Sequence, residues 1–103
     1  MAEFVEVASI DEIPADSMKV FEIENFRIVI CHTGDSYYAF ADECTHDGAP
    51  ISDGSLKNHE VICPRHGARF DVRSGAVTAP PAIVPLETYE LKIENERVLV
   101  RID

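Results

Sequence analysis

Two short segments of the chain combine cysteine with histidine. The first reads Cys44-Thr45-His46, and after sixteen intervening residues the second reads Cys63-Pro64-Arg65-His66. Thiolates and imidazoles are metal ligands, so two such segments on neighbouring loops can hold a metal centre between them. Two kinds of centre fit this ligand set. One is a mononuclear zinc ion, and the other is a [2Fe–2S] cluster in which histidines replace the cysteines on one of the two irons.

The distribution of the ligands favours the iron–sulfur cluster. Each segment supplies one cysteine and one histidine, so we expect Cys44 and Cys63 to bind one iron and His46 and His66 to bind the other. Zinc sites more often use C-x-x-C pairs. The histidine-bound iron would then lie at the tip of the loops, where electrons can pass through the imidazole edges. Because the ligand set leaves no open iron position and no nucleophile–base arrangement accompanies it, we predict an electron carrier, without catalytic residues, and not an enzyme.

The longer motifs around these ligands resemble those of a known family. Cys44-Thr45-His46-Asp47-Gly48-Ala49-Pro50 and Cys63-Pro64-Arg65-His66-Gly67-Ala68-Arg69-Phe70-Asp71 look like the two cluster-binding boxes of Rieske proteins. The chain as a whole is similar to the Rieske-type ferredoxins of bacterial aromatic-ring dioxygenase systems. The resemblance implies a soluble one-electron carrier with one Rieske [2Fe–2S] cluster per chain. Its partners would be a flavin-dependent NAD(P)H reductase and a terminal oxygenase, which dock transiently at the cluster tip.

Four positions differ from the high-potential members of that superfamily. Those proteins carry a disulfide between the boxes, whose cysteines would fall at Ala49 and Arg65 here, and hydroxyl donors whose places are taken by Ala68 and Phe70. Fewer hydrogen bonds to the cluster stabilise its reduced, more negative form less, and the net charge of the chain acts in the same direction. We therefore predict a reduction potential near the bottom of the range of roughly −150 to +300 mV for Rieske centres.

Two alternative functions remain open from the sequence. The small Rieske-type subunit of an NADH-dependent nitrite reductase has a similar size and would copurify with a large sirohaem partner. A zinc-stapled interaction module belongs to a different class and would be colourless.

The composition restricts the classes of binding partner and the cellular compartment that we expect for this protein. The 103 residues have a mass of 11.4 kDa and include 19 acidic and 9 basic residues, for a net charge of −10. Nucleic acids and anionic membranes require a basic face, so neither is an expected partner. No apolar run approaches the ~20 residues of a membrane span, and no secretory signal is visible at the N-terminus. The three cysteines are an odd number, which favours a reducing cytoplasm over a disulfide framework. A carrier this small is expected to be a monomer.

The sequence predicts β-strands as the elements that position the ligands. Alternating or β-branched patterns predict them at Phe4–Val7, Lys19–Ile23, Arg27–His32, Tyr37–Ala41, His59–Ile62, Arg69–Val72, Thr88–Glu94 and Arg97–Ile102. Turns are expected at Glu24-Asn25, Thr33–Ser36 and Asn95-Glu96, and residues 11–17 read as a loop or a single helical turn. Cys31 has no partner at ligand spacing and reads as a buried core thiol.

These strands predict an all-β protein of antiparallel sheets with one Rieske-like domain over residues 1–103. A base of sandwich or barrel type would comprise residues 1–43 and 72–103 and would carry an inserted cluster-binding subdomain, residues 44–71. Residues 44–75 contain four acidic and four basic side chains, so the whole net charge lies on the flanking segments. An insert this small needs a metal centre to hold it together.

Overall fold

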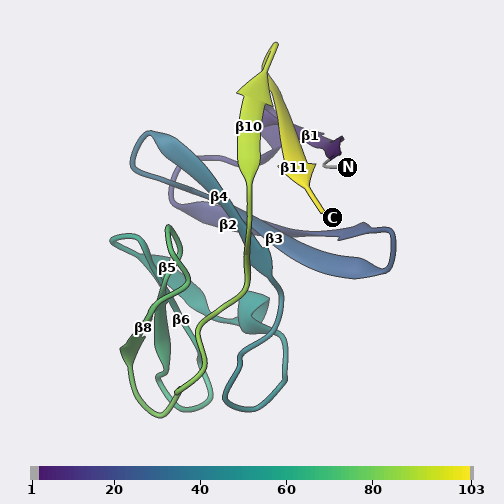
Figure 1. The fold of residues 1–103 in the computed structure, drawn as a ribbon. Coiled ribbons are helices and arrows are strands. Elements are labelled where there is room, and N and C mark those ends of the chain that lie inside the picture. Colours follow the sequence, from purple (N-terminus) through teal and green to yellow (C-terminus); the bar gives the residue numbers. More distant parts are fainter. Residues whose placement is uncertain (1–2, 103) are drawn as a thin grey trace.

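Three antiparallel sheets make up the described part of the chain, residues 3–102 of a computed structural model (Figure 1). The first sheet has the order β1-β11-β10, the second β2-β3-β4-β9, and the third β5-β6-β7-β8. The strands are β1 (Phe4–Ser9), β2 (Ser17–Ile23), β3 (Phe26–Thr33), β4 (Ser36–Ala41), β5 (Ser55–Lys57), β6 (Glu60–Ile62), β7 (Arg69–Asp71), β8 (Val77–Ala79), β9 (Thr88–Tyr89), β10 (Leu91–Glu94) and β11 (Arg97–Arg101). Two 3₁₀ turns, η1 (Ile10–Glu12) and η2 (Ile51–Asp53), are the only helical elements of residues 3–102, so the predicted all-β class is confirmed.

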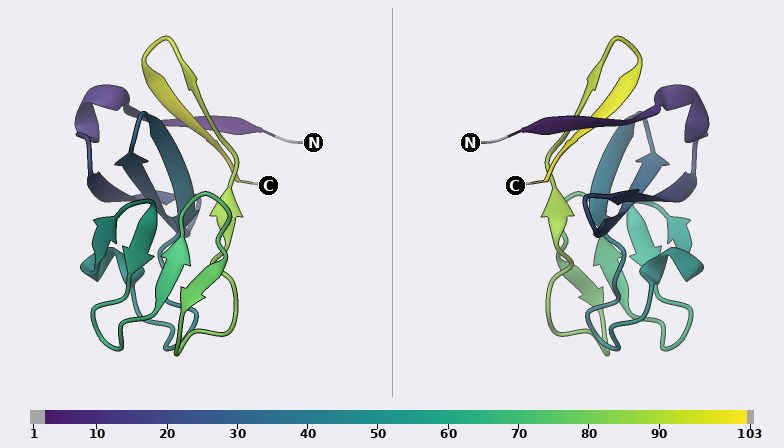
Figure 2. Two further views of the ribbon diagram at one scale, coloured as in Figure 1. Left: turned by 90° about the vertical axis from the view of Figure 1, so that its left-hand side faces the viewer. Right: turned by 90° about the vertical axis from the view of Figure 1, so that its right-hand side faces the viewer.

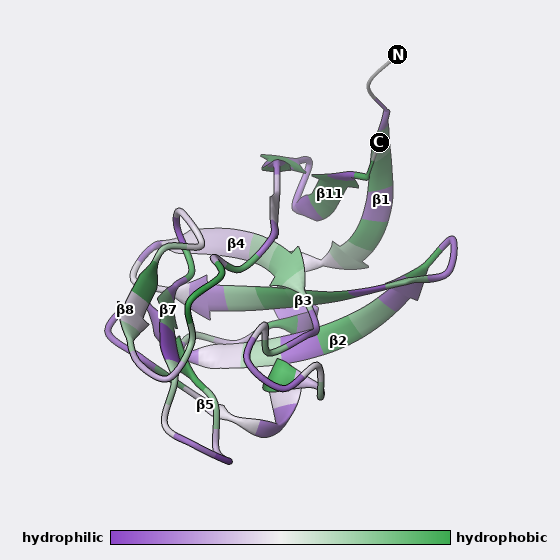
Figure 3. Ribbon diagram, turned by 60° about the horizontal axis from the view of Figure 1, so that its bottom comes forward, coloured by the Kyte–Doolittle hydropathy of each residue, from purple (hydrophilic) through white to green (hydrophobic). Residues whose placement is uncertain are grey.

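Strand β3 lies at the centre of the structure. Its run Ile28–Cys31 is fully buried, and it is coloured as hydrophobic in Figure 3. Successive side chains of a strand point to opposite faces. Accordingly, Val29 and Cys31 belong to the core that is shared with the third sheet, whereas Ile28 and Ile30 belong to the core that is shared with the first sheet. The second sheet is therefore a middle layer that packs on both faces, which explains its continuous apolar run.

Short hairpin turns fix the register of the strands. The β2–β3 turn is Glu24-Asn25 and the β10–β11 turn is Asn95-Glu96, as predicted, and all four residues have positive φ angles. Two-residue turns of this kind match the twist of the strands that they join, and asparagine tolerates the left-handed region better than most residues. The predicted turn at Thr33–Ser36 also joins neighbouring strands, since Thr33 pairs with Ser36.

The structure differs from the predicted strands by a break at Glu90, by two additional short strands and by small shifts of strand ends. The expected single strand Thr88–Glu94 is interrupted at Glu90, because β9 pairs with β4 in the second sheet while β10 pairs with β11 in the first. The strands β5 and β8 were not predicted, because each contains a single large apolar residue, Leu56 or Val77, which is too few to show an alternation. Residues 11–17 contain part of the turn η1, which Ser9 and Glu12 cap reciprocally, in agreement with the expected single turn.

The loops that follow β4, β6 and β8 gather at the end of the molecule opposite the β10–β11 hairpin, the lower end in Figures 1 and 2. The third sheet spans residues 55–79, so it extends beyond the expected limit of the insert at residue 71; the division into base and insert stays a prediction. Within residues 3–102, no helix is long and apolar enough to span a membrane.

Candidate metal centre

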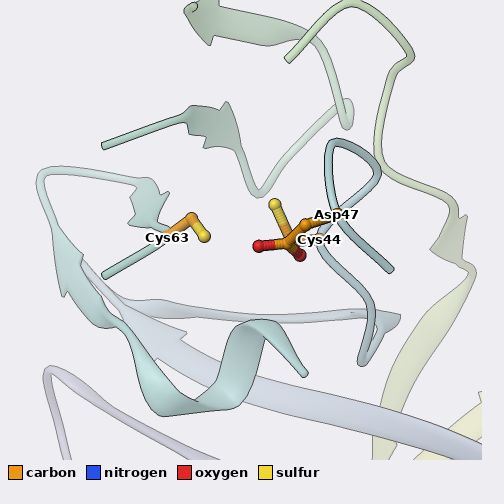
Figure 4. Close-up of side chains that lie close together, drawn as sticks. All are labelled: Cys44, Asp47 and Cys63. Carbon is orange, nitrogen blue, oxygen red and sulfur yellow. The ribbon is translucent and has the colours of Figure 1, made fainter. Parts of the chain in front are cut away.

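Two buried cysteines and two exposed histidines meet at the loop end of the molecule. Cys44 follows β4 and Cys63 follows β6, and neither side chain is accessible to solvent. Their Sγ atoms and a carboxylate oxygen of Asp47 all lie within 4.8 Å of one another, as Figure 4 illustrates. The rings of His46 and His66 lie edge to face with their centroids 5.0 Å apart, and both residues are exposed. The structure thus brings the predicted residues together as a thiol pair and an imidazole pair.

The two loops that carry the candidate ligands, residues 44–50 and 63–68 (the ligand loops), share two backbone hydrogen bonds. The Cys44 N–H donates to the Ala49 carbonyl (2.8 Å), and the Gly48 N–H donates back to the Cys44 carbonyl (2.7 Å). In the second loop the Cys63 N–H donates to the Ala68 carbonyl (2.8 Å), and the Gly67 N–H to the Cys63 carbonyl (3.0 Å). Gly48 and Gly67 have φ angles of 75° and 78°, a region that glycine enters at no steric cost. Each loop is therefore a closed turn that holds its cysteine at the base.

Burial also shapes the chemistry of the thiols. It raises the pKa of Cys44, so the thiol is neutral near neutral pH unless a cation holds it as a thiolate. Coordination to a metal ion deprotonates a thiol outright. Two buried thiols that face each other therefore match a metal centre better than they match a reactive site.

Asp47 is the site residue that the sequence analysis did not single out. Its carboxylate accepts hydrogen bonds from Arg65 Nε (2.6 Å) and from the Ala49 N–H (2.9 Å). The Arg65 hydrogen bond is the main reason that the pKa of Asp47 falls to about 2. Its oxygen also lies 3.9 Å from Nδ1 of His66. The only sequence signal was its place beside His46, which gave no indication of this pairing across the loops.

A third loop, residues 80–87, lies against the first ligand loop. The Thr45 hydroxyl donates to the Val84 carbonyl (2.6 Å), and Leu86 is buried in the same core as the two cysteines. Ile83 and Val84 point outward and are 89% and 58% exposed. Together with Pro81, Thr45 and His46 they line a surface depression of about 160 Å³. The loop therefore places an apolar surface directly beside one imidazole.

The thiol of Cys31 and the imidazoles of His32 and His59 make packing or hydrogen-bond contacts of their own. Cys31 is buried in β3, and burial raises its pKa to about 12, as expected of a core thiol. His32 stacks on Tyr37, with its Nδ1 3.0 Å from the Ile13 carbonyl. His59 packs its ring edge-on against Tyr38.

The residues fit the predicted pattern of one iron–sulfur family, and comparison with known proteins decides the assignment. The family model described as "Rieske [2Fe-2S] domain" matches residues 3–90. The chain belongs to the Rieske [2Fe–2S] domain family. Of the two centres that the sequence left open, the Rieske-type [2Fe–2S] cluster is therefore the cofactor. The buried thiol pair and the exposed imidazole pair match the two-cysteine, two-histidine donor set of such a cluster.

Curated relatives of this Rieske protein are ferredoxins. It is 33% identical over 100 residues to the ferredoxin component of the naphthalene 1,2-dioxygenase/salicylate 5-hydroxylase systems of Ralstonia sp., covering 97% of this chain and 96% of the relative. It is 35% identical over 97 residues to the biphenyl 2,3-dioxygenase ferredoxin component of Rhodococcus jostii (strain RHA1), covering 94% and 91%.

Solved structures agree with these relatives. The ferredoxin of carbazole 1,9a-dioxygenase from Nocardioides aromaticivorans IC177 superposes with a TM-score of 0.89 at 32% identity, over 94% of this chain and 95% of that one. A ferredoxin bound to the oxygenase of carbazole 1,9a-dioxygenase gives a TM-score of 0.88 at 27% identity, over 95% and 92%. A structure described as a nitrite reductase small subunit is 21% identical with a TM-score of 0.84, over 95% and 97%, which shows the fold alone.

Proposed function

We propose that this Rieske protein is a one-electron carrier that passes electrons from a flavin-dependent NAD(P)H reductase to a terminal oxygenase. The observation that carries the proposal is the pairing of two buried thiols with two exposed imidazoles at one end of the molecule. The ferredoxin components among the relatives and the solved complex of a ferredoxin with its oxygenase support the same role.

Four residues would hold the cluster. Cys44 and Cys63 would bind the inner iron as thiolates, and His46 and His66 would bind the outer iron as neutral imidazoles. When bound, the cluster accepts and releases one electron. The chain contributes the environment of that exchange: the apolar core excludes water from the cysteines, while the exposed imidazole edges provide a short route to a partner.

The same core supports a low reduction potential. Ala68 and Phe70 are fully buried with the two cysteines, and neither side chain has a hydrogen-bond donor. A cluster that accepts fewer hydrogen bonds has a lower reduction potential. The charge of −10 on the chain lowers the reduction potential as well. A low potential suits a carrier between a flavoprotein and an oxygenase.

Partner docking is proposed at the loop end, beside the imidazoles. The charges of Asp47 and Arg65 there are paired with each other. The exposed Ile83 and Val84 offer apolar contact area next to His46. We propose that partner proteins dock transiently at this surface. We also propose that this chain is a monomer and resides in the cytoplasm.

The first experiment tests the cluster and its ligands. The purified protein should be red-brown, and after dithionite its EPR spectrum should have the average g value of a mixed His/Cys cluster, below that of all-cysteine clusters. Cys44→Ser and His66→Ala should abolish or change this signal, whereas Cys31→Ser and His59→Ala should preserve it. A colourless protein that holds stoichiometric zinc after anaerobic preparation would refute the electron-transfer role.

The second experiment tests docking. We expect the reduced protein to transfer electrons to the terminal oxygenase of the carbazole 1,9a-dioxygenase from N. aromaticivorans IC177, followed by stopped-flow absorbance. Ile83→Gln should slow the second-order rate several-fold. Ile93→Gln is the matched control, since Ile93 is also exposed but lies in β10 at the opposite end. Equal rates for both variants would place docking elsewhere.

A further inference from the structure

The two ligand loops can be aligned by their shared hydrogen bonds. Cys44 corresponds to Cys63, Gly48 to Gly67 and Ala49 to Ala68. In this alignment the two histidines do not occupy equivalent positions. His46 corresponds to Arg65, and Asp47 corresponds to His66. Each loop therefore uses its two central positions for one imidazole and one charged side chain.

The charged residues meet across the loops just as the imidazoles do. Arg65 Nε donates to Asp47 Oδ2 (2.6 Å), and Arg65 Nη2 donates to the Pro50 carbonyl (3.0 Å) and more weakly to Asp47 Oδ1 (3.4 Å). The two side chains are only 29% and 20% exposed. A second carboxylate, that of Asp53, approaches Arg65 Nη1 at 3.8 Å and is itself 67% exposed. One guanidinium thus joins the second ligand loop to both the side chain and the backbone of the first.

The pair also lies beside the thiol pair. The Asp47 carboxylate is within 4.8 Å of both Sγ atoms, a distance at which a charge acts strongly in a partly buried environment. The ion pair thus links the two loops without a covalent bond.

We propose that Asp47 and Arg65 are a positioning pair for the cluster, which holds the two ligand loops together while the guanidinium balances the Asp47 carboxylate beside the cluster. The inference deepens the proposed function and rests on it, since it assumes that Cys44, Cys63, His46 and His66 bind the cluster.

The pairing predicts potential shifts of opposite sign. Asp47→Asn leaves the Arg65 charge unbalanced, and a positive charge favours the more negative reduced cluster, so the midpoint potential rises. Arg65→Gln leaves the Asp47 charge unbalanced, so the midpoint potential falls. The double variant returns towards wild type. If the substitutions acted only by loosening the loops, the midpoint potentials of both single variants would shift in the same direction.

A conservative variant separates charge from hydrogen bonding. Arg65→Lys keeps the positive charge but loses the planar fork that contacts both Asp47 and Pro50. Its midpoint potential should stay close to wild type, whereas the rate at which a chelator removes the cluster should rise several-fold. Arg65→Lys also keeps the test possible if Arg65→Gln fails to retain its cluster.

The measurement is the midpoint potential of the holoprotein by direct voltammetry, without any partner, at low and high ionic strength. Asp71→Asn and Arg73→Gln are matched controls, because they break a similar forked pair outside the ligand loops, and they should give smaller shifts. Opposite signs for the two single variants, reduced by salt, support the proposal. Shifts of equal sign, or shifts no larger than those of the controls, would overturn it. A wild-type protein without a cluster would overturn the proposed function, and this inference with it.

Discussion

Asp42 joins strand β3 of the second sheet to the 3₁₀ turn η2 through a buried carboxylate. Its side chain is fully buried and accepts hydrogen bonds from Arg27 Nε (3.2 Å) and Nη2 (2.8 Å) and from Ser52 N (2.8 Å) and Oγ (3.0 Å). Removal of one partner of a buried pair costs about 3–5 kcal/mol. Arg27 is half exposed and regains water when the carboxylate is removed, so we expect Asp42→Ala to cost about 3 kcal/mol, at the lower end of that range.

A loss of this size is a large part of the stability of a small domain, which totals about 5–15 kcal/mol. It should lower the unfolding midpoint by about 15 °C, since about 1 kcal/mol shifts Tm by roughly 4–8 °C at this size. The assay is thermal unfolding of the holoprotein followed by circular dichroism and by cluster absorbance. Ser52→Ala should lose about 1 kcal/mol, because it removes one hydroxyl bond. Asp35→Ala, in the exposed β3–β4 turn, is the control and should change stability by less than about 0.5 kcal/mol. An Asp42→Ala variant as stable as Asp35→Ala would refute the reasoning.

Three further predictions follow from burial and charge. Cys31, whose pKa is raised to about 12, should resist iodoacetamide at pH 8 in the folded holoprotein and react after unfolding, as mass spectrometry can show. The pKa of Asp71 is lowered chiefly by its hydrogen bond from Arg73, so its contribution to stability is present above the unfolded-state pKa of about 4 and is lost as pH falls through the lower folded-state pKa. Denaturant unfolding of Asp71→Asn should therefore show a weaker loss of stability on acidification than wild type. Gly54→Ala should cost about 2 kcal/mol in urea unfolding, because its Cβ would overlap the Ile62 carbonyl oxygen, and a variant of normal stability would contradict that packing.

Local patterns were enough to predict the hairpins of the first two sheets. Strands β2 and β3 alternate or are β-branched, and Asn25 marks the turn between them, so both the elements and their pairing follow from neighbouring residues. The four cysteine and histidine positions could also be predicted as one site, because the ligand types and their spacing restrict the chemistry strongly.

The remaining features depend on contacts between distant residues. The pairing of Asp47 with Arg65 is determined by how two loops face each other, and no local pattern encodes it. The interruption at Glu90 arises because the chain leaves one sheet and enters another, which the continuous alternation of residues 88–94 conceals. The exposure of Ile83 follows from the anchoring of its loop by Thr45 through Val84, since the sequence alone would place an isoleucine inside.

The pairing of β4 with β9 brings the two ends of residues 42–87 to neighbouring positions in the second sheet. Phe40 pairs with Thr88, and the Ala41 N–H donates to the Glu87 carbonyl (2.9 Å), so the segment between them leaves and re-enters the second sheet at adjacent positions. The segment also packs on the second sheet, since Val29 and Cys31 share a core with Phe70 of the third sheet. Insertions or deletions in the exposed loops of this segment can therefore change the surface beside the redox centre while the register of the supporting strands stays the same, provided that the residues of the shared core are kept.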